Sequence, residues 1–498
     1  MQTLNIKYIN DYKNNIDKYG FDTTWHNIIS NIEVEETLIS ELYEIGLAHI
    51  NKDEKKQSGQ YFTNADVATV MAKWFVSLDG ENICDVCCGT GNLILSFFDI
   101  IGKEKTKELI YNNNIYLYDK DSTALYVYKK IIEKRYGVET SDKVNYITCD
   151  FLDKDIHLPP KSKVICNPPY FKITNFNKQW DFTSNMKLSK EFYSCIMEKI
   201  LNESISSVII TPYSFIGGIK FCELRKVLDE NNGFIVSFDN VPGNIFAGKK
   251  HGVFNSNKTN SVRAAITVTE NKKNVLGYRV SPLIRFKSEE RILILNNDIL
   301  NSVIPDTYQT SDIEKGYYKC DKSLITLFNK WNEISNKTLS DLIVADSAFC
   351  LCMPNSCRYF TVATQKDLKR TGKDIIYFNN EEDFLLSYCL LNSSLCYWYW
   401  RLYDGGILFS SRLRNQIPIF FDSLTKQQKD KLKEIAKEMI SKEETYLTYK
   451  KNAGEFQENV KFPDLYRKTI NQLFLETFNE SGDSIDIIHR NHFFNNID

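Results

Sequence analysis

Asn167-Pro168-Pro169-Tyr170 follows a short apolar run, and its residue types could bind a flat group that bears an amino group. Two prolines fix the backbone dihedrals and remove two backbone donors. The Pro168 carbonyl and the Asn167 side-chain oxygen can therefore converge as acceptors on one target, with the Tyr170 ring beside them. An isolated Pro-Pro pair after a strand is usually a simple turn, so this interpretation depends on the segments upstream.

A glycine-containing turn, Asp85-Val86-Cys87-Cys88-Gly89-Thr90-Gly91, lies between a predicted strand and a helix predicted to begin near Asn92. Glycines at such a turn let the backbone come close to a ligand, and an acid at the strand end can bind a ribose hydroxyl or an ammonium group. The missing third glycine of GxGxxG argues against a dinucleotide site. Taken alone, the turn is equally consistent with an ordinary strand-to-helix connection.

Two further predicted strands also end in acids. Asp119 ends the strand at 115–118, where it could hold ribose hydroxyls or instead cap the following helix. Asp150 and Phe151 end the next strand, where the carboxylate could accept from an adenine amino group while the ring packs on the base. The alternative for this pair is a turn acid beside a core phenylalanine. Three strand-end acids in successive units together predict a nucleoside pocket along the carboxyl edge of a sheet.

The elements that would position these residues are short apolar runs separated by helical stretches. The runs occupy residues 83–88, 115–119, 144–150, 163–167, 206–211, 233–239 and 261–268. Strands that alternate with helices predict a parallel sheet with helices on both faces. The predicted fold is therefore α/β, with a Rossmann-like doubly wound sheet.

The regions on either side have different patterns. Residues 1–57 are predicted to be a helical lead-in, because Val34, Leu38, Leu42 and Ile45 recur at helical spacing. Beyond Glu270 the pattern is less regular and predicts a second, α+β domain. Its expected features are a strand at 374–378, a packed core helix containing the aromatic tract 397–400, and a final helix. That helix has a capping box, Thr425 to Gln428, and an apolar face formed by Leu432, Ile435, Ala436 and Met439.

Composition narrows the class of protein. The chain has 498 residues, 43% of them hydrophobic and 25% charged, which is typical of a folded globular protein. With 62 basic and 64 acidic side chains, the net charge is -2, so any DNA-facing charge must be local. Thirteen scattered cysteines favour reduced thiols. Cys350, Cys352 and Cys357 lack paired spacing and a nearby histidine, which favours buried hydrophobes over a zinc site.

Taken in order, these segments resemble a known family. Gln60-Tyr61-Phe62-Thr63, the turn Asp85–Gly91, Asp119, Asp150-Phe151 and Asn167–Tyr170 resemble the motifs of S-adenosylmethionine-dependent DNA adenine-N6 methyltransferases of restriction-modification type. The resemblance extends over residues 58 to 270. Only a short stretch separates Asp150 from Asn167, and the QYFT segment is N-terminal, so the motif order resembles that of the gamma class, with a C-terminal target recognition domain.

The resemblance implies a role for each matching residue. Thr63 would hold the methionine carboxylate of S-adenosylmethionine, Asp85 would lie near its amino group, and Gly89 and Gly91 would admit it. The other implied cofactor residues are Tyr61, Cys88, Asp119 for the ribose, and Asp150 with Phe151 for the adenine. Asn167 and Pro168 would accept from the target 6-amino group, next to Pro169, and Tyr170 would stack on the target base. Phe246, in a segment resembling a later catalytic motif, is the second stacking candidate, or simply a loop phenylalanine.

The resemblance also implies an organisation and a set of partners. The expected parts are a lead-in at 1–57, a catalytic domain at 58–285 and a target recognition domain with C-terminal helices at 286–498. DNA contacts are expected from loops at 366–373 and 405–414. The expected partners are double-stranded DNA and a separately encoded restriction endonuclease, with no metal and no membrane. The expected location is the cytoplasm of a prokaryote, at the nucleoid when the protein is bound to DNA.

Three alternatives remain open from the sequence. NPPY also serves methyltransferases that act on RNA adenine or protein glutamine, although the long C-terminal region argues against them. A non-catalytic DNA-binding subunit with a degenerate fold is disfavoured by the intact segments Asp85–Gly91 and Asn167–Tyr170. A methylation subunit that needs a separate specificity partner is the third alternative.

Overall fold

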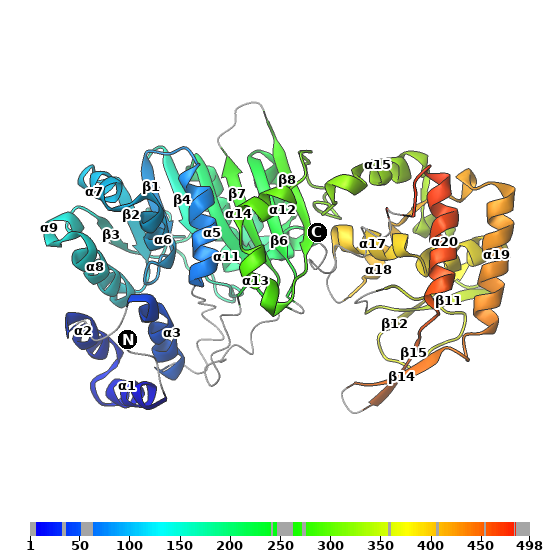
Figure 1. Ribbon diagram of the computed structural model, residues 1–498, viewed down its shortest axis with the longest axis horizontal. Coiled ribbons are helices and arrows are strands. Elements are labelled where there is room, and N and C mark those ends of the chain that lie inside the picture. Colours follow the sequence, from blue (N-terminus) through cyan, green and yellow to red (C-terminus); the bar gives the residue numbers. More distant parts are fainter. Residues whose placement is uncertain are drawn as a thin grey trace. The chain divides into compact units, whose positions relative to one another are not determined.

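The computed structural model describes residues 6–31, 36–50, 63–240, 243–246, 262–270, 275–356, 360–404, 408–452, 455–482 and 484. The chain divides into two compact units, Met1–Tyr317 and Tyr318–Asp498. In Figure 1 the first unit runs from blue to green and the second from green to red. Within the described ranges, no helix is both long and apolar enough to cross a membrane.

A mostly parallel sheet forms the centre of the first unit. Its eight described strands lie in the order β3, β2, β1, β4, β5, β7, β6 and β8. In that order they span Asn145–Thr148, Ile115–Asp119, Asn82–Val86, Ser162–Cys166, Ser206–Pro212, Ala264–Glu270, Asn232–Phe238 and Gly277–Ile284. The strand order reverses between β1 and β4, and ligands of such sheets bind outside the carboxyl ends of strands at this point. The expected Rossmann-like α/β fold is confirmed.

Helices cover both faces of the sheet because the central strands are apolar on both sides. Cys84 and Val164 share a hydrophobic core with residues of α11 (Phe192–Glu203) and α12 (Cys222–Asp229). Successive side chains of a strand alternate between faces, so Asp85 points away from this core. α5 (Ala65–Val76) and α6 (Asn92–Ile101) contact each other and β4, and α8 (Ser122–Tyr136) contacts β2 and β3 (Figure 1).

The sheet departs from the sequence-based prediction at its far edge. β7 was expected to be parallel, but it runs antiparallel to both neighbours, β5 and β6. Parallel neighbours need a crossover connection, whereas antiparallel neighbours do not. β8, which the sequence did not predict, pairs parallel to β6. The alternation of strand and helix therefore ends with β6.

Three helices precede the sheet and belong to the first unit. They are α1 (Ile6–Tyr19), α2 (Phe21–Asn31) and α3 (Glu36–Ile50). Trp25 is central to their core, with its ring centroid 4.9 Å from that of Tyr43 and 6.1 Å from that of Tyr12. The Thr123 hydroxyl of α8 donates to Asp22 Oδ1 of α2 at 2.6 Å. The predicted helix near residue 38 is confirmed, and hydrogen bonds join its bundle to the sheet layer.

The first unit also extends beyond residue 285, where the catalytic domain was expected to end. α13 (Arg291–Ile294) and α14 (Asn297–Ser302) follow β8, and Trp74 Nε1 of α5 donates to Asn301 Oδ1 at 2.9 Å. The Tyr317 hydroxyl donates to Asp229 Oδ1 at the end of α12. These hydrogen bonds hold the segment after β8 to the first unit, which ends at Tyr317.

The second unit combines helices and strands around one hydrophobic core. An antiparallel sheet has the order β10 (Ile343–Val344), β12 (Lys373–Phe378) and β11 (Phe349–Pro354). α16 (Glu381–Leu391) packs on both β11 and β12. The aromatic tract lies in α17 (Ser394–Tyr403), whose residues are all buried, as expected for a core helix.

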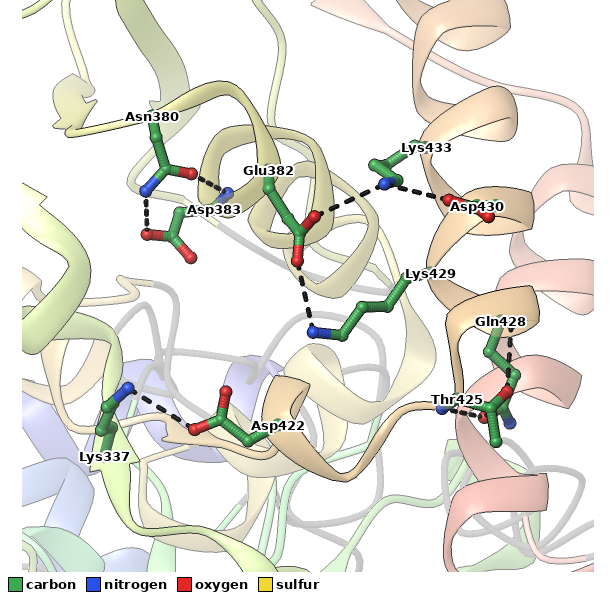
Figure 2. Close-up of polar contacts among 10 residues, drawn as sticks. All are labelled: Lys337, Asn380, Glu382, Asp383, Asp422, Thr425, Gln428, Lys429, Asp430 and Lys433. Atoms are coloured by element: carbon green, nitrogen blue, oxygen red, sulfur yellow. Dashed lines mark hydrogen bonds and ion pairs between the residues drawn. The ribbon is translucent and has the colours of Figure 1, made fainter.

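α19 (Lys426–Ser441) begins at the capping box predicted from the sequence. Thr425 Oγ1 accepts from the Gln428 N–H at 3.2 Å, and Gln428 Oε1 accepts from the Thr425 N–H at 2.9 Å. The predicted apolar face, Leu432, Ile435, Ala436 and Met439, is buried. Figure 2 shows Glu382 of α16 bridging Lys429 and Lys433 of α19, at 3.2 and 3.4 Å. Both predictions for this helix are confirmed.

The remaining elements of the second unit include a β-hairpin, β14 (Leu447–Asn452) with β15 (Glu455–Val460), followed by α20 (Asp464–Thr477). Shorter elements complete the two units: α7 (Lys103–Tyr111), α9 (Val138–Ser141), α10 (Ser184–Ser189), α15 (Ile325–Ile334), β9 (Lys337–Thr338), α18 (Ser411–Asn415) and β13 (Pro418–Ile419).

Candidate active site

The turn after β1 carries the first candidate residues. Cys87, Gly89 and Gly91 all have left-handed backbone conformations, with φ of 57°, 53° and 92°. Gly89 lines a cavity of about 560 Å³, but Gly91 does not. A Cβ atom on Gly91 would lie only 2.3 Å from Cζ of Tyr128 in α8. Gly91 was expected to admit the cofactor, whereas the structure places the Tyr128 ring against it.

Asp119, at the end of β2, is held by backbone N–H groups from two loops. Its Oδ2 accepts from Gly89 at 2.7 Å and its Oδ1 from Asp121 at 2.8 Å. The alternative role as a helix cap belongs to Asp121, whose Oδ1 accepts from the N–H groups of Thr123 and Ala124. Burial raises the pKa of Asp119 to about 6, against the lowering effect of the two N–H donors. At neutral pH Asp119 is therefore an ionised acceptor on the cavity wall.

Asp85 lies under the turn and is fully buried. Among the described residues, no hydrogen-bond partner reaches either of its carboxylate oxygens within the usual criteria. Burial, together with the nearby Asp119 carboxylate, raises the pKa of Asp85 well above its usual range. A buried carboxyl without a partner avoids the cost of a buried charge by staying protonated, unless a cation or donor reaches it. Asp85 does not itself line the cavity.

Asp150 and Phe151 lie beyond the end of β3. Asp150 Oδ1 accepts from the Leu152 N–H at 3.2 Å, so it partly fulfils the alternative role of a turn acid. Phe151 is buried and packs edge-on against Tyr118, with ring centroids 5.5 Å apart. Lys199 Nζ lies over the Phe151 ring, 5.0 Å from its centroid. Both candidates nevertheless line the cavity.

One cavity of about 560 Å³ collects most of the candidate residues. Its volume lies within the range typical of small-molecule sites. The candidates on its wall are Thr63, Cys88, Gly89, Asp119, Asp150, Phe151, Asn167 and Pro169. Tyr61 lies outside the described residues. Acids lie along the strand ends, and Phe171, Trp180 and Phe192 add an aromatic wall that the sequence did not predict.

Asn167, directly after β4, lines the cavity and links the Thr63 segment to Tyr170. Its Nδ2 donates to Thr63 Oγ1 at 2.9 Å, and its Oδ1 accepts from the Tyr170 hydroxyl. That hydroxyl also lies 3.1 Å from the Ile210 carbonyl oxygen of β5. A carbonyl-type oxygen such as Asn167 Oδ1 has two lone pairs and can accept more than one hydrogen bond. Thr63 Oγ1 is the acceptor in its bond with Asn167.

Phe246, the second stacking candidate, lies beside Tyr170. The two ring centroids are 5.6 Å apart and the rings are inclined by 63°. Phe246 is placed by Asn244, whose Oδ1 accepts from the Phe246 N–H at 2.8 Å. The structure therefore brings Phe246 against Tyr170, which lies in the same loop as Asn167 but far from Phe246 in the sequence.

The N-terminal helices supply a wall that the sequence analysis missed. Tyr43 and Leu47 of α3 line the cavity, and the Tyr43 hydroxyl donates to Asp121 Oδ2 at 2.7 Å. Ser40, one turn earlier, lies 2.7 Å from Thr90 Oγ1 and donates to Asn92 Oδ1 at 2.5 Å. Tyr43 and Leu47 are four residues apart and share a helix face, and this spacing was the available signal.

Comparison with known proteins gives the family. The family described as N-6 DNA methylase matches residues 34–275, which include α3 and the segment from Thr63 to Phe246. Residues 34–275 therefore belong to the N-6 DNA methylase family. The family expected from the sequence, that of adenine-N6 DNA methyltransferases, is thereby confirmed for this segment.

Two curated relatives are also named as a methyltransferase and a methylase subunit. The chain is 26% identical over 287 residues to the type II methyltransferase M.VspI of a Vibrio species, covering 56% of this chain and 67% of the relative. It is 21% identical over 231 residues to the methylase subunit of the type I restriction enzyme MpnII of Mycoplasma pneumoniae, covering 41% of each chain. Among solved structures, a DrdV–DNA complex has a TM-score of 0.41 at 15% identity, covering 64% of this chain and 37% of that one.

Proposed function

We propose that this chain binds S-adenosylmethionine in the cavity beside β1 and β2 and transfers its methyl group to N6 of an adenine flipped out of double-stranded DNA. The observation that carries this proposal is the Asn167–Thr63 hydrogen bond, 2.9 Å long. It joins the amino-group site of the Asn167 loop to the wall of the nucleoside-type cavity. A methyl donor and an amine could therefore lie next to each other.

Different cavity residues would bind different parts of the cofactor. Asp119 would accept from the ribose hydroxyls, Asp150 from the adenine amino group, and Phe151 would border the base. Thr63 would donate to the methionine carboxylate, and Asp85, buried beneath the turn, would lie near the ammonium group without lining the cavity. The bound cofactor supplies an activated methyl group, so the protein mainly has to align the two reactants.

The loop after β4 would hold the target amine. Asn167 Oδ1 and the Pro168 carbonyl would accept its two hydrogens, which raises electron density on nitrogen as the new bond forms. Tyr170 and Phe246 would pack on the flipped base. Stacking contributes about 1–3 kcal/mol per base in related systems, which offsets a flipping cost of a few kcal/mol.

The second unit would be the target recognition domain. Of the expected DNA-contacting loops, 366–373 pairs with the hairpin, since the Lys369 N–H donates to Glu458 Oε2 at 2.8 Å. Exposed Tyr449 and Phe456 and the basic pair Lys450 and Lys451 lie on this hairpin. A two-stranded ribbon of this kind fits the major groove of DNA.

The other loop expected to contact DNA, 405–414, offers fewer residues for such contacts. Residues 405–407 lie outside the described residues. Arg414 is buried, and its Nη1 donates to Asp374 Oδ2 at 2.6 Å, so it stabilises the core of the unit. The proposal therefore assigns the principal DNA contacts to the hairpin and the loop 366–373. It retains a separately encoded restriction endonuclease as a partner and the prokaryotic cytoplasm as the location.

Transfer assays with purified protein test the proposed reaction. The protein is incubated with tritiated S-adenosylmethionine and, separately, with unmethylated duplex DNA, RNA and a protein extract. Label in duplex DNA, recovered as 6-methyladenine, is the expected result. Label only in RNA or protein would overturn the choice of substrate. The name of the Mycoplasma relative also motivates the alternative of a methylation subunit, which predicts cofactor binding without transfer until a specificity partner is added.

The two hairpin lysines, Lys450 and Lys451, should contribute to DNA affinity by neutralising backbone phosphates. Replacing Lys450 and Lys451 with Ala should weaken DNA binding for all sequences and reduce the slope of log K against log salt by about 1 per lysine. Binding is measured by fluorescence anisotropy at several salt concentrations. The matched control replaces Lys429 and Lys433, which are paired with Glu382. Equal slopes for both double variants and the wild type would exclude the hairpin from the DNA interface.

Tyr43 should matter for cofactor affinity. Tyr43→Ala removes a cavity wall and the donor to Asp121, and a hydrogen bond to a charged group contributes about 1.5–3 kcal/mol. We expect S-adenosylmethionine affinity, measured by calorimetry, to fall about tenfold or more. Tyr111→Ala, at the exposed end of α7, is the control. Unchanged affinity in Tyr43→Ala would show that α3 only borders the site.

A further inference from the structure

The two loops that carry the proposed target-base site are far apart in the sequence but share one anchor. One is the segment 63–66, which begins with Thr63 and includes the first two residues of α5. The other is the segment 243–246, which ends with Phe246. The side chain between them is Arg291, the first residue of α13. It follows the segment that matches the methylase family, which ends at residue 275.

Arg291 makes a four-part contact with these loops. Its Nε and Nη2 donate to the two carboxylate oxygens of Asp66, at 2.7 and 3.0 Å. Its Nη1 donates to the Asn244 carbonyl at 2.7 Å, and Nη2 donates also to the Ile245 carbonyl at 2.8 Å. Arg291 is only 8% exposed. A planar guanidinium fixes the directions of these donors, so the two loops must keep one relative placement.

Each of the two loops also contacts a residue of the proposed target-base site, so its position affects that residue. On one side, Thr63 Oγ1 accepts from Asn167, and the neighbouring Asn64 Nδ2 lies 3.4 Å from the Phe246 carbonyl oxygen. On the other, Asn244 Oδ1 holds the Phe246 N–H, and the Phe246 ring packs against Tyr170. The separation between the Asn167 acceptor and the Phe246 ring therefore depends on both loops.

We propose that Arg291 is a positioning residue that sets the width of the target-base site, by holding the loop of Phe246 against the loop of Thr63. This inference rests on the proposed function, because it assigns the space between Asn167, Tyr170 and Phe246 to the flipped adenine. It adds a residue from outside the matched methylase segment to the machinery of the reaction. Arg291 does not line the cavity, so its proposed role is to position the two loops rather than to contact the base or the cofactor.

Lysine cannot replace arginine here. Its ammonium is a compact charge on a flexible stem, so it can pair with Asp66 or reach one carbonyl but cannot hold a bidentate carboxylate and two carbonyls together. A displacement of about 1 Å away from the chemistry can lower a rate about 100-fold. The Asp119 side of the cavity has its own anchors, Gly89 and Asp121, so cofactor affinity should be preserved.

The test compares Arg291→Lys with a matched control, Arg225→Lys. Arg225 is also a buried arginine that donates to backbone carbonyls, those of Gly218 at 2.7 Å and Ile313 at 2.7 Å, but these carbonyls lie outside the site. Single-turnover methyl transfer to unmethylated DNA, S-adenosylmethionine affinity and Tm are measured for the wild type and both variants. Arg291→Lys should transfer about 100-fold more slowly, with cofactor affinity within about twofold of the wild type. Arg225→Lys should transfer at close to the wild-type rate.

Hydrogen–deuterium exchange gives a readout that does not need activity. Peptides covering 63–68 and 243–246 should exchange faster in Arg291→Lys, while those covering 119–121 should not change. A wild type that methylates no DNA would overturn the proposed function, and this exchange pattern would still decide whether Arg291 joins the two loops. Equal rates in Arg291→Lys and the wild type, equal losses in both variants, or unchanged exchange at the two loops would overturn the inference.

Discussion

Asn167→Ala should lose methyl transfer while keeping its affinity for S-adenosylmethionine. The variant removes an acceptor that would stabilise the amine more in the transition state than in the ground state. Removing one such preorganised group typically costs about 10²–10³-fold in rate. Single-turnover transfer to unmethylated DNA measures the loss, and calorimetry measures the affinity.

Two further variants control this experiment. Asn167→Asp keeps an acceptor at the same place and should retain more activity than Asn167→Ala. Asn145→Ala removes an asparagine of edge strand β3, whose Nδ2 donates to the Ile115 carbonyl at 3.0 Å, and should leave transfer unchanged. Undiminished methylation by Asn167→Ala would remove the catalytic assignment of the Asn167 loop.

Asp119→Ala should have the largest effect on cofactor binding. Two hydrogen bonds from ribose hydroxyls to a carboxylate would be lost, at about 1.5–3 kcal/mol each, so we expect affinity to fall at least 100-fold. The control is Asp142→Ala, in which an exposed acid paired with Lys129 is removed from the same unit. An affinity close to that of the wild type would exclude Asp119 from the ribose site.

The same carboxyl predicts a pH dependence. Because its pKa is raised to about 6, Asp119 takes up a proton below that pH and loses acceptor capacity. The dissociation constant for S-adenosylmethionine should therefore rise as pH falls below about 6, approaching tenfold per pH unit. Unfolding driven by Asp119 would not explain this loss. An acid with a raised pKa binds its proton first in the folded state, so its own contribution to stability improves as pH falls from 6 towards 3.8.

Much of the fold could be predicted because the sheet is buried on both faces. β1, β2, β4 and β5 are short apolar runs, and each was predicted to within two residues of its observed bounds. β8 was missed because Arg279 and Ser281 interrupt its apolar pattern, although both contact residues of the neighbouring strand β6. The direction of β7 depends on pairing with β5, which no local pattern encodes.

In the proposed site, too, local patterns predicted some residues, whereas others depend on tertiary packing. Strand-end residues such as Asp119 and Asn167 could be predicted, because parallel strands bring their carboxyl ends to one edge. Gly91 was assigned to the cofactor, since a sequence does not show that the Tyr128 ring lies where its side chain would be. Tyr43 and Arg291 lie on helices before and after the sheet, and only tertiary packing brings them to the site.

Single-molecule sequencing of DNA from a methylation-free host that expresses this chain alone tests the central claim most directly. The account predicts 6-methyladenine at a shared sequence context, present with the wild type and absent with Asn167→Ala. That result would establish the reaction and the role of the second unit in recognition together. DNA without modified adenine, from cells in which the folded protein is present and binds S-adenosylmethionine, would contradict the claim that this chain alone recognises and methylates DNA.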